Sequence, residues 1–156
     1  MLPGRDILLE RVEELARSAH DGALLVLGDA GSGKSTLLAE VHRRDRELYS
    51  LVRINHREAA WPLSGIAALL SAIGDPRAAE FAGRFALRTD EPAHHAEAAA
   101  ALLAVLRGLG LPRRVLLVDD IDRMDEVSRH VVGYMAGHLA GSGLRIAAAA
   151  TEVRAD

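Results

Sequence analysis

The feature that most constrains this chain is an eight-residue loop that satisfies the pattern G-x-x-x-x-G-K-[ST]. The loop consists of Gly28, Asp29, Ala30, Gly31, Ser32, Gly33, Lys34 and Ser35. An apolar run at 23–27 before the loop predicts a buried strand, and the pattern at 35–44 after it predicts a helix. Glycines let backbone amides turn inward around an anion, and a helix start adds unpaired N–H groups and a positive dipole end. The loop is therefore predicted to cradle the phosphates of a nucleotide.

The side chains of this loop have separate expected roles. Lys34 is expected to reach the β- and γ-phosphates of ATP, and Ser35 to place its hydroxyl on Mg²⁺. Thr36, the next residue, is also expected at the nucleotide. Lys34 is the only lysine among 19 basic residues, the others being arginine. Lysine suits a tight phosphate cradle because its ammonium is a compact charge on a flexible stem, whereas guanidinium is a broad planar fork.

The rest of the chain alternates apolar strands with helices. Further strands are expected at 49–54, 115–118 and 145–150, and helices at 6–19, 63–73, 77–85, 93–109 and from 125 to about 139. The strands are apolar throughout, which is typical of a parallel sheet covered on both faces. The sequence predicts one α/β domain over residues 1–156, a three-layer sandwich with a mainly parallel sheet and helices on both faces.

A second, acidic site is predicted where the strand at 115–118 ends. A carboxylate at the end of a strand that neighbours a phosphate loop can hold the Mg²⁺ shell, and this role is assigned to Asp119. Asp120 is expected to polarise the attacking water as a general base, with helix capping or plain solvation as the alternative. Thr151, after the last strand, is expected either to orient that water or simply to end the strand. Aspartate is shorter than the glutamate of vigorous ATPases, so at most slow, Mg²⁺-dependent hydrolysis is expected.

The overall composition argues against several other classes of protein. The formal net charge of −3 does not favour a general grip on nucleic acid. The absence of cysteine excludes disulfides and thiolate metal sites. The sequence has no run of about 18 apolar residues, and its N-terminus is charged, so neither a membrane span nor a signal peptide is expected. These features predict a cytoplasmic protein.

Four smaller features yield structural rather than functional expectations. His94 and His95 lack partners at metal-ligand spacing and are expected at a solvated helix start. Trp61, the only tryptophan, is expected to pack its loop against the domain, with stacking on a nucleotide base as the alternative. The alanine-rich segment 96–106 predicts a core helix, and Asp125 is expected to cap a helix by accepting a hydrogen bond from the amide of Ser128.

With these motifs in place, the chain resembles the ATPase domain of LuxR-type large regulators, which belong to the signal-transduction ATPases with numerous domains, a branch of the AAA-like P-loop proteins. The likeness rests on the phosphate loop and its strand, on Pro3-Gly4-Arg5-Asp6 with Leu9 and Leu15, on Trp61-Pro62-Leu63-Ser64-Gly65-Ile66 with Leu69-Leu70, and on Asp119-Asp120 with Asp125 and Ser128. It implies that Gly4 and Arg5 line the adenine pocket. It also implies a switch, in which ATP binding shifts a regulator between closed and open states and hydrolysis resets it.

The sequence also departs from the family pattern. The family usually has an arginine close behind the fourth strand, whereas Arg154 is spaced differently here and is expected to be exposed. The resemblance implies the strand order 5-1-4-3-2, but the fifth strand, the helical lid and the winged-helix domain are absent. Without strand five, the strand at 23–27 becomes an edge that invites pairing with another chain. We therefore expect either that this chain is a fragment of a longer regulator or that a partner, such as a second copy, covers this edge. The DNA-binding domain of the regulator is expected outside this chain.

A phosphate loop also occurs in proteins that are not switches. A stand-alone enzyme such as a small-molecule kinase is the alternative. Arg84 and Arg88 could belong to the mobile lid of a kinase, but no acceptor pocket is recognisable in the sequence. A GTPase is disfavoured because its N-K-x-D motif needs a second lysine, and a nucleic-acid motor is disfavoured by the acidic balance.

Overall fold

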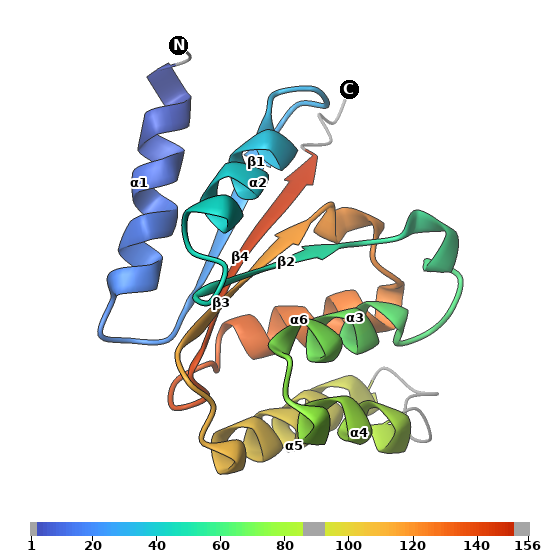
Figure 1. Ribbon diagram of the computed structural model, residues 1–156. Coiled ribbons are helices and arrows are strands. Elements are labelled where there is room, and N and C mark those ends of the chain that lie inside the picture. The colour runs from blue at the N-terminus through green and yellow to red at the C-terminus, as the bar shows by residue number, and fades with distance from the viewer. Residues whose placement is uncertain (1–2, 86–92, 152–156) are drawn as a thin grey trace.

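The computed structural model of the chain describes residues 3–85 and 93–151 (Figure 1). Arg88 and Arg154 lie outside these ranges. The described elements are helices, strands and two short 3-10 helices: α1 (Pro3–Arg17), β1 (Ala23–Gly28), α2 (Lys34–Arg44), β2 (Tyr49–Arg53), η1 (His56–Glu58), α3 (Ser64–Ile73), α4 (Pro76–Phe85), α5 (Ala93–Leu109), β3 (Arg114–Asp119), η2 (Ile121–Arg123), α6 (Glu126–Ala136) and β4 (Leu144–Thr151).

The four strands form one parallel sheet in the order β1-β4-β3-β2. This is the expected order without a fifth strand, so the prediction of an α/β fold with a P-loop-like parallel sheet is confirmed. Because all strands run the same way, their carboxyl ends meet at one edge of the sheet, and the loops that follow them are gathered there (Figure 1). The register pairs Gly28 at the end of β1 directly with Thr151 at the end of β4.

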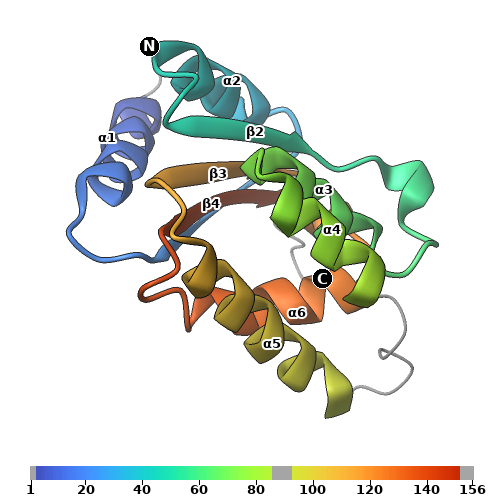
Figure 2. The same ribbon diagram turned by 60° about the horizontal axis from the view of Figure 1, so that its bottom comes forward.

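Helices cover both faces of the sheet, as Figure 2 shows in a view along its layers. On one face, Val12 of α1 and Leu38 and Val41 of α2 pack against the β3 and β4 side chains that include Leu117 and Ala147. On the other face, α3, α4, α5 and α6 form the larger core. The segment 96–106 lies within α5 and buries several residues there, as expected for a core helix: Ala99, Leu102, Leu103 and Leu106.

The bounds of most elements differ from the prediction by a residue or more. α1 begins at Pro3, and β3 extends to include Asp119. α6 ends at Ala136 instead of near Leu139, because the backbone N–H of Gly137 caps the helix by bonding to the carbonyls of Tyr134 and Met135. The chain then turns through loop residues into β4, so Leu139 packs into the core from the loop.

β1 is an edge strand of this sheet and its outer side chains are open to solvent. Leu25 is 56% exposed and Leu27 is 54% exposed, whereas Val26 between them is buried. β1 thus buries the side chains on one of its faces. The exposed apolar side chains, Leu25 and Leu27, lie on the other face, on the side of the sheet that carries α6.

Candidate functional site

The loop between β1 and α2 leaves the start of α2 open. Gly31 and Gly33 have φ angles of 78° and 92°, in the left-handed region that favours glycine. Gly33 is the N-cap of α2, so no side chain caps the first amides of this helix. Ser35 and Thr36, in the first turn of α2, are exposed, as are Ala30 and Ser32 in the loop. An uncapped helix start with exposed amides has the geometry that suits an anion.

Lys34 lies folded back over this loop. Its Nζ donates hydrogen bonds to the carbonyl oxygens of Gly28 at 2.6 Å and Asp29 at 2.8 Å, and to Oγ of Ser32 at 3.3 Å. All three acceptors belong to the loop itself. The ammonium is thus held at the opening of the α2 helix by bonds that a rotation of its flexible side chain would release.

The two aspartates at the end of β3 differ in their surroundings. Asp119, the last residue of the strand, is buried at 8% exposure, and its Oδ1 has no hydrogen-bond partner among the described residues. A buried, unpaired carboxylate oxygen is costly unless a cation or water completes it, so this atom is suited to a hydrated metal ion. Asp120, the next residue, has a φ of 53° and is the N-cap of η2, although its side chain makes no capping hydrogen bond.

The sheet brings most of the predicted site residues to the same edge. The phosphate loop follows β1, and Thr151 ends β4 directly beside Gly28. Asp119 ends β3, which lies on the far side of β4 from β1, and Asp120 follows it. The backbone N–H of Thr151 donates to Oδ1 of Asp122 at 3.4 Å, which links the end of β4 to η2. The site predicted in three separate parts of the sequence therefore occupies one edge.

Gly4 and Arg5 lie in the first turn of α1, which starts at the same end of the molecule as the loop between β1 and α2 (Figure 1). The guanidinium of Arg5 forms an ion pair with Glu40 in the second half of α2. The hydrogen bond from Arg5 lowers the pKa of the Glu40 carboxyl and outweighs burial, which raises this pKa. The charges of Arg5 and Arg44 lower the pKa further. Arg5 thus ties α1 to the helix that carries the phosphate loop.

A buried carboxylate behind the site was only partly predicted. Asp125 accepts a hydrogen bond from the amide of Ser128 at 3.0 Å, as predicted for a helix cap. It also accepts from the amides of Leu63 at 2.8 Å and Gly65 at 2.9 Å and from the hydroxyl of Ser64 at 3.2 Å. We call these five residues the Asp125 cluster. Burial raises the pKa of the Asp125 carboxyl, but the hydrogen bonds from Gly65, Ser128 and Leu63 outweigh it and the pKa lies below its ordinary value.

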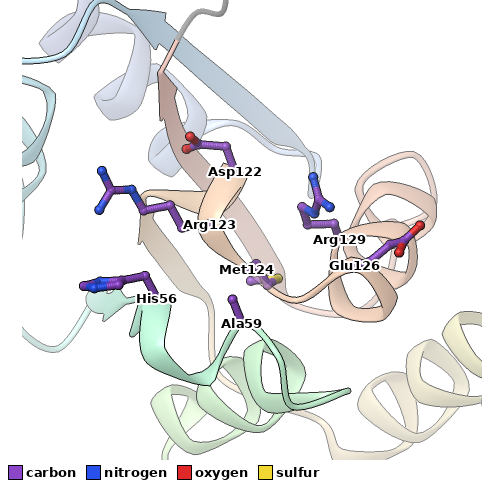
Figure 3. A pocket seen from close by; sticks show the side chains of 7 residues that line it. All are labelled: His56, Ala59, Asp122, Arg123, Met124, Glu126 and Arg129. Atoms are coloured by element: carbon purple, nitrogen blue, oxygen red, sulfur yellow. The ribbon is translucent and has the colours of Figure 1, made fainter.

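A cavity of about 480 Å³ lies between η1 and η2, beside the predicted site but lined by none of its residues. Its lining is polar and mixed in charge, as Figure 3 shows: His56, Ala59, Asp122, Arg123, Met124, Glu126 and Arg129. His56 and Arg123 point to the same side, and Arg129 and Glu126 point away from them on α6 (Figure 3). No pattern in the sequence singles out this cavity, because one wall comes from η1 and Ala59 and the other from η2, Met124 and α6, more than 60 residues later in the chain.

Two minor expectations were wrong. Trp61 does not pack its loop against the domain, because its side chain is 63% exposed. The core position in this loop is taken by Leu63, two residues later, which is buried. His95 is not solvated either: it is buried, and its Nδ1 lies 3.2 Å from Nδ1 of His130 on α6. His94 is exposed, as expected.

Comparison with protein families gives one match. The model of the AAA ATPase domain matches residues 1–146 of this chain, which includes the phosphate loop, both aspartates and the first three residues of β4. A search of curated proteins found no match. Within residues 3–85 and 93–151, no helix has the length and apolar character to cross a membrane. The same residues contain no group of three or more His, Asp or Glu side chains placed to hold a metal ion.

Proposed function

This chain belongs to the AAA ATPase domain family, and from that premise we propose that it is the ATP-controlled switch domain of a LuxR-type large transcriptional regulator. Nucleotide binding and ATPase activity are the properties of the family. The proposal adds that the bound nucleotide sets the state of a larger protein, that residues 1–156 are one domain of it, and that it reaches DNA only through a domain outside this chain.

The observation that carries this proposal is the open start of α2 at the same edge of the sheet as the unpaired oxygen of Asp119. We assign the phosphates of ATP or ADP to the backbone of the loop and the first turn of α2, with Lys34 rotating from its carbonyl partners onto the β- and γ-phosphates. Gly4 and Arg5 are assigned to the adenine side. The residues assigned to the phosphates are Gly28, Asp29, Ala30, Gly31, Ser32, Gly33, Lys34, Ser35 and Thr36.

Mg²⁺ is assigned to the hydroxyl of Ser35 and the carboxylate of Asp119. These residues fit the ion, because Mg²⁺ is usually held by one or two protein oxygens together with water and substrate phosphates, and not by a cage of protein ligands. The buried Oδ1 of Asp119 lacks the partner that such a shell would supply. When bound, Mg²⁺ would neutralise charge on the phosphate oxygens.

Two residues are assigned to slow hydrolysis. Asp120 is placed as the general base that accepts a proton from the attacking water, and Thr151 as the residue that orients this water. The left-handed backbone of Asp120 supports a functional role, because a non-glycine residue in this region stores about 1–3 kcal/mol of strain that active sites often retain. Slow turnover suits a switch, since the bound state must persist long enough to be sensed.

The test is thermal unfolding with and without Mg²⁺–ATP and Mg²⁺–ADP. Ligand at a hundred times its dissociation constant stabilises by about 2.7 kcal/mol, which corresponds to roughly 5–10 °C in a domain of this size. We expect this shift in the wild type and in Arg43→Ala, which removes an exposed positive charge from the same helix. Lys34→Ala should lose most of the shift.

The outcome against the proposal is equally specific. A shift of the same size in Lys34→Ala would show that nucleotide binds elsewhere. Steady turnover that rises when a second small-molecule substrate is added would identify an ordinary transferase and contradict the switch.

A further inference from the structure

The cavity between η1 and η2 has no part in the proposed nucleotide site (Figure 3). Its volume is about 480 Å³, and sites for small molecules typically have about 300–1,000 Å³. One wall includes His56, and the other includes Asp122, Arg123, Glu126 and Arg129. None of the residues that we assign to ATP, Mg²⁺ or water lines this cavity, so nucleotide binding does not account for it.

The cationic side chains of this cavity lack partners within the described protein. Within residues 3–85 and 93–151, neither Arg123 nor Arg129 forms an ion pair or a side-chain hydrogen bond. The imidazole of His56 has no hydrogen-bond partner in these ranges either. This holds although Asp122 and Glu126 line the same cavity. Both guanidinium groups are therefore available to an anion that enters from solvent.

Arg123 and His56 together suit one anionic group. They come from opposite walls and point to the same side of the cavity (Figure 3). A guanidinium presents a planar fork that binds both oxygens of a carboxylate or a phosphate, and an imidazole N–H can donate to the same group. Such charge-assisted hydrogen bonds are roughly twice as strong as neutral ones. This side of the cavity is therefore suited to a carboxylate or a phosphate.

The two carboxylates of the cavity restrict the rest of the ligand. Asp122 and Glu126 would repel a ligand that carries negative charge throughout. An ionised carboxylate only accepts hydrogen bonds, so these two residues favour hydroxyl or ammonium donors on the ligand. The matching chemical class is a small organic anion with such donors, which includes hydroxy acids, amino acids and phosphorylated polyols.

The walls of the cavity are held by hydrogen bonds of the protein itself. The amide of Ala59 donates to the carbonyl of His56 at 3.3 Å and closes η1. The Asp125 cluster joins the two walls, because Asp125 follows the buried lining residue Met124 and accepts from the amide of Leu63 at 2.8 Å. A site whose backbone is already fixed loses less freedom on binding, which favours affinity.

From these observations we infer that the cavity between η1 and η2 binds a small organic anion with hydroxyl or ammonium groups, whose carboxylate or phosphate is held by Arg123 and His56. This goes beyond the nucleotide switch, because it assigns a second ligand. Asp122 links the two sites: its Oδ1 accepts from the N–H of Thr151 at 3.4 Å, and Thr151 pairs with Gly28 at the phosphate loop. The ligand should therefore change the affinity for nucleotide, and this part alone rests on the proposed function.

The test is isothermal titration calorimetry of the whole chain with two probes, malate and glycerol phosphate. We expect a dissociation constant of about 1 mM or tighter for at least one probe, and none for glycerol, which lacks the anion. Arg123→Gln should weaken this binding at least about tenfold. Arg57→Gln is the matched control, because Arg57 is an exposed cation of η1 that does not line the cavity. Binding of malate alone assigns a carboxylate to the site, and binding of glycerol phosphate alone assigns a phosphate.

Several outcomes would overturn the inference. One is the absence of binding of both probes up to about 10 mM, and another is equal binding by Arg123→Gln and the wild type. Glycerol phosphate binding that is lost in Lys34→Ala and kept in Arg123→Gln would place the probe at the phosphate loop instead. Circular dichroism checks that each variant is folded.

The link to the nucleotide is measured by titrating Mg²⁺–ADP with and without the bound probe. We expect the affinity for ADP to change by about fivefold or more, and an unchanged affinity would overturn the link through Asp122. A chain that binds the probe but not ADP would contradict the proposed nucleotide function and support the cavity as a separate site.

Discussion

The starts of helices α2 and α3 are built alike and are completed differently. Each helix follows a residue in the left-handed region, Gly33 at φ 92° and Leu63 at φ 69°, and neither of these N-cap residues provides a side-chain cap. Both starts therefore present backbone N–H groups that need an acceptor. At α3 the acceptor is the carboxylate of Asp125, an anion that the protein itself supplies. At α2 the comparable position is exposed.

The difference separates an anion site that the protein itself fills from one that we propose takes up an exchangeable anion. Asp125 is only 4% exposed and joins the start of α3 to the start of α6, so its charge is part of the core. The start of α2 instead has a cation nearby, because Lys34 bonds to carbonyls of its own loop and can rotate away from them. A site that must take up and release phosphates requires this second arrangement.

The largest expected effect comes from removing the permanent anion. Asp125→Ala leaves the buried amides of Leu63, Gly65 and Ser128 without their acceptor, and each unsatisfied donor costs about 1–3 kcal/mol. Partial access of water lowers the sum, so we expect a loss of about 3–4 kcal/mol in the free energy of unfolding, measured by urea denaturation.

Asp125→Asn is the control for this variant, because its amide oxygen can still accept while the charge is gone. It should lose about half as much, since a hydrogen bond to a charged group is roughly twice as strong as a neutral one. If Asp125→Ala lost less than about 1 kcal/mol, the comparison between the two helix starts would fail.

The two sites also differ in how far the sequence could predict them. The phosphate loop is contiguous, and its glycines, lysine and following helix all lie within one short segment, so local chemistry sufficed to predict its shape. The parallel sheet was predictable for a similar reason, because apolar strands and helices alternate along the chain. The prediction that these residues act on a nucleotide remains a prediction.

The Asp125 cluster was predictable only where its partners are close in sequence. The bond from Asp125 to Ser128 spans three residues and follows a capping pattern. The bond to Leu63 spans 62 residues, and no local pattern specifies it. The exposure of Trp61 was missed for the same reason, since the left-handed backbone of Leu63, held by Asp125, sends Leu63 into the core.

The second prediction tests how closely the permanent site is packed. A Cβ on Gly65 would lie 2.2 Å from Cγ of Met124 and 2.9 Å from Cβ of Ser128, both of which are buried. Overpacking of this kind costs about 1–3 kcal/mol, so Gly65→Ala should lower the free energy of unfolding by that amount.

Gly133 provides the matched control for Gly65. It lies in α6, is exposed, and a Cβ there would meet nothing within 4 Å. Gly133→Ala should therefore stabilise the protein by about 0.5–1 kcal/mol through helix propensity. Equal effects of the two substitutions in urea denaturation would show that α3 and α6 are not closely packed at the Asp125 cluster.

The smallest expected effect is on the pH dependence of stability. Burial raises the pKa of Asp125, but the hydrogen bonds from Gly65, Ser128 and Leu63 outweigh it, so the pKa in the folded protein lies below the ordinary value of 3.8. Folding therefore favours the ionised carboxylate. Its contribution is fully present above pH 3.8 and is lost as the pH falls through the lowered value. Each unit of this depression corresponds to about 1.4 kcal/mol.

Urea denaturation of the wild type and Asp125→Asn from about pH 6 to about pH 3 measures this contribution. The difference in stability between the two proteins should shrink toward the acid end, because Asn cannot titrate and the wild-type carboxylate becomes protonated. If the difference stays constant over this range, the charge of Asp125 does not stabilise the fold. The N–H groups at the start of α3 would then need only a correctly placed hydrogen-bond acceptor. The start of α3 would then differ from that of α2 in packing alone, and the comparison of the two as anion sites would no longer hold.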